Sequence, residues 1–138
     1  MKATGIVRRI DDLGRVVIPK EIRRTMRIRE GDPLEIYTDK DGGVIFKKYS
    51  LMGGLGDFAG QMCETLNKTT GEIAVITDRD ACIAVAGLAR RELTDKRISS
   101  ELEQIMEGRQ IYQYQAGDKA VPVSDDGSKY LVACAAPI

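Results

Sequence analysis

Hydrophobic and polar positions at the start of the chain form short runs that end at turn residues. Residues 4–10 and 15–18 are rich in β-branched side chains, a composition typical of strands. The four residues between them, 11–14, read Asp-Asp-Leu-Gly, which favours a turn. The pattern predicts a β-hairpin over residues 4–18.

A short helix is expected next. Pro19 has a fixed φ and lacks an N–H, which suits the first helical position. Within residues 20–27, Ile22 and Met26 lie four residues apart among charged neighbours, so we expect the helix to bury one face. Gly31 is expected to close the helix.

A second hairpin completes the first fifty residues. Residues 34–38 and 44–48 have the composition of strands, and the tight turn Asp-Gly-Gly at 41–43 joins them. The expected order is β-β-α-β-β. A unit this small buries too little apolar surface to stand alone without disulfides or a metal, so we expect it to dimerise.

The chain changes character after residue 48. Residues 51–56 are rich in glycine and are expected to form a linker. Phe58, Met62 and Leu66 then recur at four-residue intervals, which predicts an amphipathic helix. The expected elements of this part are helices at 57–67 and 99–107, strands at 73–77, 82–86 and 130–136, and a turn at 78–80. Alternating strands and helices indicate an α/β or α+β domain over residues 57–138.

The net charge of the chain is zero, but the charge is unevenly distributed. Residues 1–49 hold 12 basic and 8 acidic side chains, net +4. Within residues 1–29 the numbers are 9 and 3, net +6. The asymmetry indicates a cationic module for an acidic partner, carried by a neutral-to-acidic companion domain.

Composition excludes several classes of protein. The longest uncharged stretches fall far short of the roughly 18 apolar residues of a spanning helix, so we expect no membrane contact and a cytoplasmic location. The chain has no histidine, no G-x-x-x-x-G-K-[ST] loop and no activated Cys or Ser, so we expect no enzyme. Cys63, Cys82 and Cys134 are too widely spaced for a zinc site, and neither a metal nor a cofactor is expected.

The first part of the chain carries a family resemblance. Residues 5–49, and above all LGRVVIPKEIRR at 13–24, closely resemble the AbrB-type transition-state regulators of spore-forming bacteria. The resemblance implies a domain over residues 1–50 with the swapped-hairpin barrel fold, in which two chains exchange hairpins to form one dimer. It also implies a DNA-binding regulator of sporulation or stationary-phase genes, whose partner is double-stranded DNA.

The resemblance further implies which side chains contact DNA. The matching positions are Arg8, Arg15, Arg23 and Arg24. A guanidinium is permanently charged and offers a planar fork of donors to a phosphate or a base edge. Candidates for supporting phosphate contacts, otherwise solvated surface, are Arg9, Lys20, Arg27 and Arg29. Such a face reads groove shape more readily than a strict base code, so we expect sequence-tolerant binding.

Residues 57–138 resemble GAF-type sensor domains, through the order of elements and the sequence ITDRDACIAVAG at 76–87. The resemblance implies a sensor or oligomerisation domain whose small-molecule effector the sequence does not identify. GAF domains normally continue past a strand such as 130–136 with another strand and a long helix. We therefore expect an incomplete domain, either a natural short form or a fragment.

An alternative function stays open beside the transcription regulator. An antitoxin-like swapped-hairpin protein would bind its own operator and a toxin partner. Toxin-neutralising tails are usually short and partly disordered, whereas residues 57–138 have the composition of a folded domain, which favours the regulator. The operator, the sign of regulation and the choice between dimer and tetramer are left open.

Overall fold

The computed structural model describes residues 1–50, 53–127 and 129–138. The chain divides into two compact units, Met1–Tyr49 and Ser50–Ile138, which are described separately. The predicted linker begins at residues 51 and 52, which lie outside the described residues, and continues as a short 3-10 helix, η1 (Gly53–Leu55).

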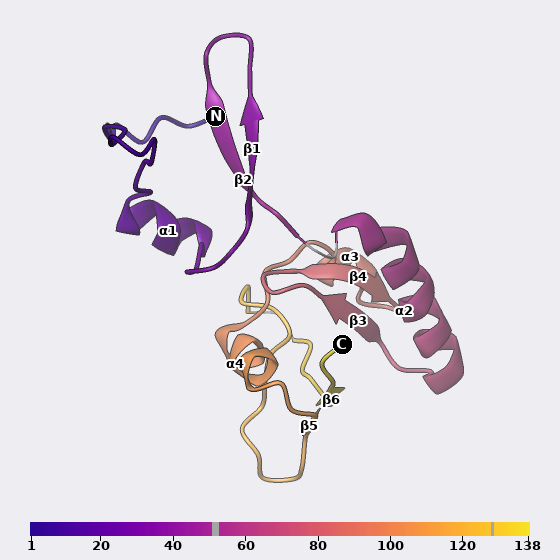
Figure 1. Cartoon of the computed structure of the whole chain (residues 1–138). Coiled ribbons are helices and arrows are strands. Elements are labelled where there is room, and N and C mark those ends of the chain that lie inside the picture. The colour runs from indigo at the N-terminus through magenta and orange to yellow at the C-terminus, as the bar shows by residue number, and fades with distance from the viewer. Residues whose placement is uncertain (51–52, 128) are drawn as a thin grey trace. The chain divides into compact units, whose positions relative to one another are not determined.

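The first unit contains one helix and one hairpin (Figure 1). α1 (Lys20–Met26) is followed by β1 (Leu34–Thr38), which pairs antiparallel with β2 (Val44–Lys48). In the turn between the strands, the Asp39 carboxylate accepts a hydrogen bond from the N–H of Gly43 at 2.6 Å. The second predicted hairpin is therefore confirmed, with both strands at the predicted bounds.

Both ends of α1 differ from the expectation. Pro19 is the N-cap, with φ −56° and ψ 146°, and its carbonyl accepts the N–H of Arg23 at 3.0 Å. The helix ends where Arg27 adopts the left-handed conformation, with φ 53° and ψ 44°. The N–H of Ile28 then returns to the carbonyl of Arg23 at 2.8 Å, as in a Schellman motif. The expectation that Gly31 closes the helix is therefore wrong.

The expected buried face of α1 is also absent from the single chain. No residue of the helix is buried, and Met26 is 45% exposed. Ile22 is half-buried, and the clusters of fully buried residues in the described chain all lie in the second unit.

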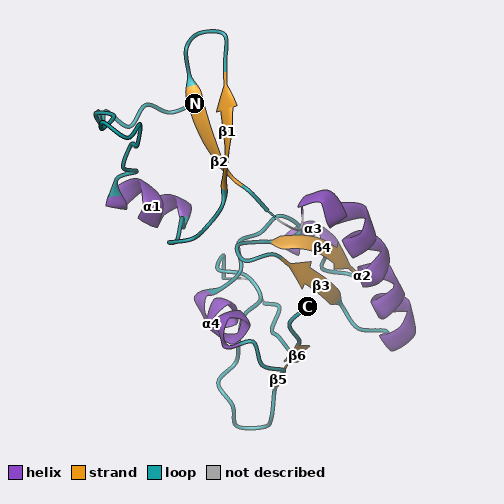
Figure 2. Cartoon of the chain, in the orientation of Figure 1, coloured by secondary structure: helices purple, strands orange, loops and turns teal. Residues whose placement is uncertain are grey.

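Only the turn of the first predicted hairpin is formed. The N–H of Asp11 donates to the carbonyl of Arg15 at 3.0 Å, and the N–H of Gly14 donates to the carbonyl of Asp11 at 3.1 Å. Described residues 1–18 contain no strand, and the segment before α1 runs as loop (Figure 2). A strand needs a hydrogen-bonded neighbour, and the described part of one chain places none beside this segment. The described residues of a single chain therefore form no closed barrel.

The second unit packs a long helix on a hairpin. α2 (Gly56–Thr70) lies along the antiparallel pair β3 (Ala74–Thr77) and β4 (Cys82–Ala86) (Figure 1). Ala59 and Cys63 are the buried side chains of α2, and their small size lets the helix approach the strands closely. The predicted helix and both predicted strands are confirmed, and the helix extends three residues past the prediction, to Thr70.

Strand β4 is buried on both faces. Ala84 and Ala86 pack in the cluster beneath α2. On the other side a second core gathers around α3 (Arg90–Leu93) and α4 (Ser100–Gly108). That core comprises Cys82, Val85, Ala89, Leu93, Ile98, Leu102, Val121 and Val123. The core of the second unit therefore lies on the two sides of β4.

The strands of the second unit form two separate two-stranded sheets. β5 (Tyr112–Gln113) pairs with β6 (Cys134–Ala135), so the predicted strand 130–136 is reduced to two residues and an isolated bridge between Pro122 and Leu131. A proline has no N–H to donate and cannot extend the ladder at that bridge. A single layered GAF-like sheet is thus not confirmed. None of the described helices is both long and apolar enough to cross a bilayer.

Candidate nucleic-acid interface

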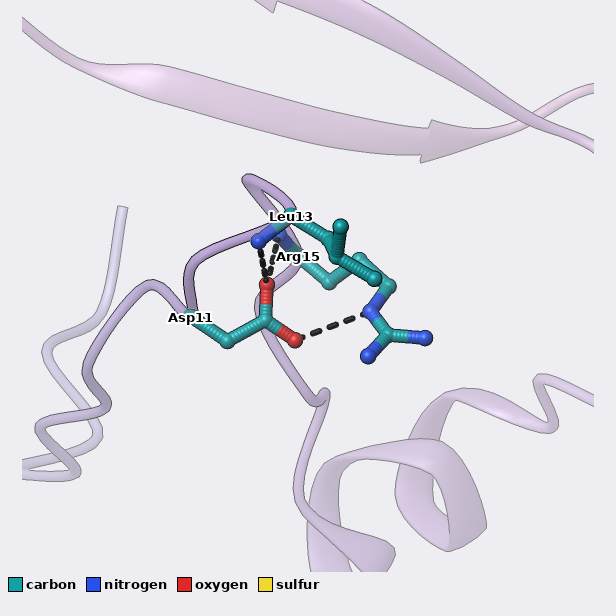
Figure 3. A network of polar contacts seen from close by, with 3 residues as sticks. All are labelled: Asp11, Leu13 and Arg15. Carbon is teal, nitrogen blue, oxygen red and sulfur yellow. Dashed lines mark hydrogen bonds and ion pairs between the residues drawn. The ribbon is translucent and has the colours of Figure 1, made fainter.

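Arg15 is held by Asp11 across the first turn (Figure 3). Oδ1 of Asp11 accepts the backbone N–H groups of Leu13 at 2.9 Å and of Arg15 at 2.8 Å. Oδ2 pairs with the guanidinium Nε of Arg15 at 2.8 Å. These contacts, the backbone N–H of Arg15 first, hold the pKa of the Asp11 carboxyl below its ordinary value, so the carboxylate is charged at neutral pH. The Arg15 side chain nevertheless remains 70% exposed.

Arg23 and Arg24 are exposed in the last turn of α1. Two positive charges at a helix C-terminus are favourable with the helix dipole. Nε of Arg23 donates to the carbonyl of Ile18 at 3.1 Å, which ties its side chain to the chain before the helix. This contact leaves the terminal nitrogens of that guanidinium for a ligand.

Arg8 and Arg9 lie in the loop before the turn, and both are exposed. Nη1 of Arg8 donates only to the carbonyl of the preceding residue, Val7, at 3.3 Å. The structure therefore gives this part of the predicted site no fixed geometry in one chain. The contacts of Arg8, Arg15 and Arg23 go to different neighbours, namely the Val7 carbonyl, the Asp11 carboxylate and the Ile18 carbonyl.

The predicted supporting cations differ in exposure. Lys20 is the first residue of α1 and is exposed. Arg27 and Arg29 are half-buried, and the carbonyl of Arg27 accepts Nζ of Lys48 at 3.0 Å. Arg27 and Arg29 are therefore at least partly engaged in holding the first unit together.

The sequence interpretation treated Asp11 and its neighbour Asp12 as turn residues only. Asp11 does shape the turn, but it also binds the side chain of a candidate DNA contact. The sequence feature that could have predicted this pairing is an acid and an arginine four residues apart, with a glycine turn between them. Such spacing is common for surface pairs, and periodicity alone does not single it out.

All three cysteines belong to the second unit. Burial raises the pKa of Cys63, and it raises the pKa of Cys82 to about 11 together with the charges of Asp126 and Asp78. Thiols with raised pKa values are poor nucleophiles. Within the described ranges, no group of three or more His, Cys, Asp or Glu side chains is placed to hold a metal ion.

Comparison with known proteins finds an AbrB-like first part and a C-terminal family over the rest of the chain. The chain belongs to the family described as "Stage V sporulation protein T C-terminal, transcription factor", which matches residues 54–138. Because this family comprises transcription factors, the expectation that the chain is no enzyme is confirmed. A second family, "Antidote-toxin recognition MazE, bacterial antitoxin", matches residues 7–51.

Two proteins of Bacillus subtilis (strain 168) are similar over different lengths. Stage V sporulation protein T is 61% identical over 109 residues, which is 79% of this chain and 61% of that protein. Transition state regulatory protein AbrB is 65% identical over 49 residues, 36% of this chain and 50% of that protein. The matches thus cover less than two thirds of either relative. The solution structure of the N-domain of the transcription factor abrB covers 36% of this chain and 92% of its own, at 63% identity and a TM-score of 0.33.

Proposed function

We propose that the chain is a DNA-binding transcription regulator of sporulation or stationary-phase genes. Residues 1–50 would bind double-stranded DNA as a symmetric dimer, and the resulting dimers can pair into tetramers. The contacts would come from Arg8, Arg15, Arg23 and Arg24, with support from Arg9, Lys20 and Arg27. Binding would be sequence-tolerant, because flexible arginines on such a face respond to phosphates and groove shape.

The observation that carries the proposal is the exposure of these four arginines in a segment of high positive charge. Residues 1–29 have a net charge of +6, and all four side chains are exposed. A phosphate backbone is the natural partner of such a surface, because each neutralised phosphate releases a counterion. The 65% identity to AbrB over 49 residues adds support, since the N-terminal domain of that protein is described as a DNA recognition domain.

The proposed dimer also accounts for the exposed apolar side chains of the same segment. Six apolar side chains between residues 6 and 17 are exposed, namely Ile6, Val7, Ile10, Leu13, Val16 and Val17. Leaving them in water forgoes roughly 1.5–3 kcal/mol for each that a fold could bury. Exchange of the first hairpin with a second copy would bury these side chains and supply the missing strand partners.

Residues 57–138 would serve as a GAF-like sensor or oligomerisation domain, joined to the first by a linker at 51–56. The well-packed core on both sides of β4 supports a folded domain in this region. A small-molecule effector of unknown identity and a cytoplasmic location belong to the same proposal.

Binding of a fluorescent A/T-rich duplex, measured by anisotropy, tests the proposed site. Each of the four substitutions Arg→Ala at positions 8, 15, 23 and 24 should weaken binding about tenfold, the lower part of the range for a good arginine contact. Arg91→Ala is the matched control, because Arg91 is an exposed arginine of the second unit. Equal affinities for all five variants would contradict the proposal.

An antitoxin is the second candidate, because the MazE family matches residues 7–51. The two candidates share the DNA-binding unit and differ in the partner of the C-terminal region. Co-purification of the full chain with the product of an adjoining reading frame, at a fixed stoichiometry, would favour the antitoxin. Self-association without such a partner would favour the regulator.

A further inference from the structure

Three contacts join Asp11 and Arg15, and each residue both donates and accepts hydrogen bonds. The backbone N–H of Asp11 donates to the carbonyl of Arg15, and the N–H of Arg15 returns to Oδ1 of Asp11 at 2.8 Å. Oδ2 of Asp11 then pairs with Nε of Arg15 at 2.8 Å. Oδ1 also accepts the N–H of Leu13, so one carboxylate holds both the turn and the guanidinium (Figure 3).

The arrangement is local. All the groups lie within residues 11–15, and Gly14 supplies the positive φ of 75° that the tight turn needs. It therefore forms in one chain, independently of how the flanking strands find partners. Arg15 is the only one of the four proposed DNA contacts whose guanidinium pairs with a carboxylate in the described part of the chain.

Asp11 contacts the Arg15 guanidinium at Nε and not at a terminal nitrogen. Pairing through Nε occupies one edge of the guanidinium and leaves the two terminal nitrogens, Nη1 and Nη2, unoccupied on a side chain that is 70% exposed. These nitrogens can form a bidentate contact with a phosphate or with a guanine edge. A free arginine must be immobilised on binding, which lowers the affinity about two- to twelvefold per side chain.

We propose that Asp11 is a positioning residue for DNA binding, which holds Arg15 with its terminal nitrogens directed toward the nucleic acid. The inference rests on the proposed function and assigns a role to an acidic residue within its cationic surface. Charge alone would give Asp11 the opposite effect, because a carboxylate close to DNA repels the phosphates. The two accounts therefore predict opposite signs when the carboxylate is removed.

Asp11→Asn separates the two tasks of the side chain. An asparagine oxygen can still accept the N–H groups of Leu13 and Arg15, and asparagine favours the same turn. Its amide nitrogen is a donor and cannot accept from Nε of Arg15. Asp12→Asn is the matched control, because it makes the same charge change one residue away on an exposed side chain.

The test measures affinity for a fluorescent duplex with the full chain, and compares thermal midpoints to confirm folding. Asp12→Asn should bind as tightly as the wild type or more tightly. Asp11→Asn should bind at least about fivefold more weakly than Asp12→Asn, because a dimer has two Arg15 side chains to immobilise. In an Arg15→Ala background, the two asparagine variants should bind equally.

Either of two results with the asparagine variants would overturn the inference. Equal tightening by both asparagine variants would mean that Asp11 acts only as a charge. A deficit of Asp11→Asn that persists in the Arg15→Ala background would mean that it acts only on the turn. If Arg23→Ala and Arg24→Ala weaken binding while Arg15→Ala does not, the proposed function stands and this inference fails. If none of the three weakens binding, the proposed function itself fails.

Discussion

Lys48 of β2 donates a hydrogen bond from Nζ to the carbonyl oxygen of Arg27 at 3.0 Å. Arg27 is the left-handed residue that ends α1, so the bond joins the second hairpin to the C-terminus of the helix. A lysine suits this position, because the last carbonyls of a helix carry partial negative charge. The contact thereby connects the helix that carries Arg23 and Arg24 to the hairpin of β1 and β2.

Lys48→Met should therefore weaken both the fold and the proposed DNA site. We expect the free energy of unfolding of the first unit to fall by about 1 kcal/mol, the usual value of such a hydrogen bond. We also expect weaker duplex binding, because α1 is less firmly held. Lys40→Met is the control, since Lys40 is an exposed lysine in the turn of the same hairpin. Urea unfolding and anisotropy give the two readouts, and equal behaviour of both variants would contradict the argument.

We expect the Ser99 hydroxyl to stabilise the second unit. Its Oγ accepts the N–H of Leu102 at 3.0 Å, as the N-cap of α4, and donates to the carbonyl of Pro122 at 2.6 Å. Because Ser99 is only 2% exposed, water does not replace these bonds when they are lost. Ser99→Ala should destabilise the unit by about 2 kcal/mol.

The neighbouring residue provides the control for this prediction. Ser100 is exposed, and its hydroxyl donates to the adjacent Glu101 carboxylate at 3.1 Å. Ser100→Ala should change the free energy of unfolding by less than about 0.5 kcal/mol. The urea midpoints of the two variants should therefore differ clearly, and coincident unfolding curves would show that the Ser99 cap contributes nothing.

We expect the buried thiol of Cys82 to make the free energy of unfolding fall as the pH rises above 9. Burial first, and then Asp126 and Asp78, raise the pKa of the thiol from 9.0 to about 11 in the fold. The folded chain thus holds this proton more tightly than the unfolded chain does. The resulting stabilisation is fully present below pH 9 and is lost as the pH rises toward 11. Its size is on the order of 3 kcal/mol, because each pKa unit corresponds to about 1.4 kcal/mol.

Thermal unfolding between pH 8 and pH 11 measures this dependence. Cys82→Ala should be less stable than the wild type at pH 8, because it leaves a cavity, but its stability should fall less steeply above pH 9. Cys134→Ala should follow the wild-type slope, because Cys134 is exposed. Parallel curves for Cys82→Ala and Cys134→Ala would contradict the assigned cause.

Elements with a strong local signal could be predicted from the sequence. β1, β2 and β4 follow β-branched runs with turn residues between them, and their predicted bounds match the structure. α2 follows the four-residue spacing of Phe58, Met62 and Leu66, yet these side chains lie exposed while Ala59 and Cys63 face the core. Periodicity therefore located the helix, but small residues determined which side packs.

Features that depend on other chains or on side-chain geometry could not be predicted in the same way. Residues 4–10 and 15–18 have strand composition, but a strand forms only beside a partner, and the described chain offers none. Arg27 ends α1 in a left-handed conformation, which a glycine or an asparagine at this position would have indicated. The pairing of Asp11 with Nε of Arg15 likewise depends on the exact course of the turn.

The most direct test of the central claim is the salt dependence of duplex binding for the wild type and for Arg23→Ala/Arg24→Ala. If eight arginines of a dimer meet phosphates, log K against log[salt] should have a slope of roughly −7, and losing four of them should halve that slope. Arg90→Ala/Arg91→Ala is the matched control, because it removes an adjacent exposed pair from α3. A steep wild-type slope that is halved only in the first variant is the expected result. Weak binding with the same slope in all three proteins would contradict the account.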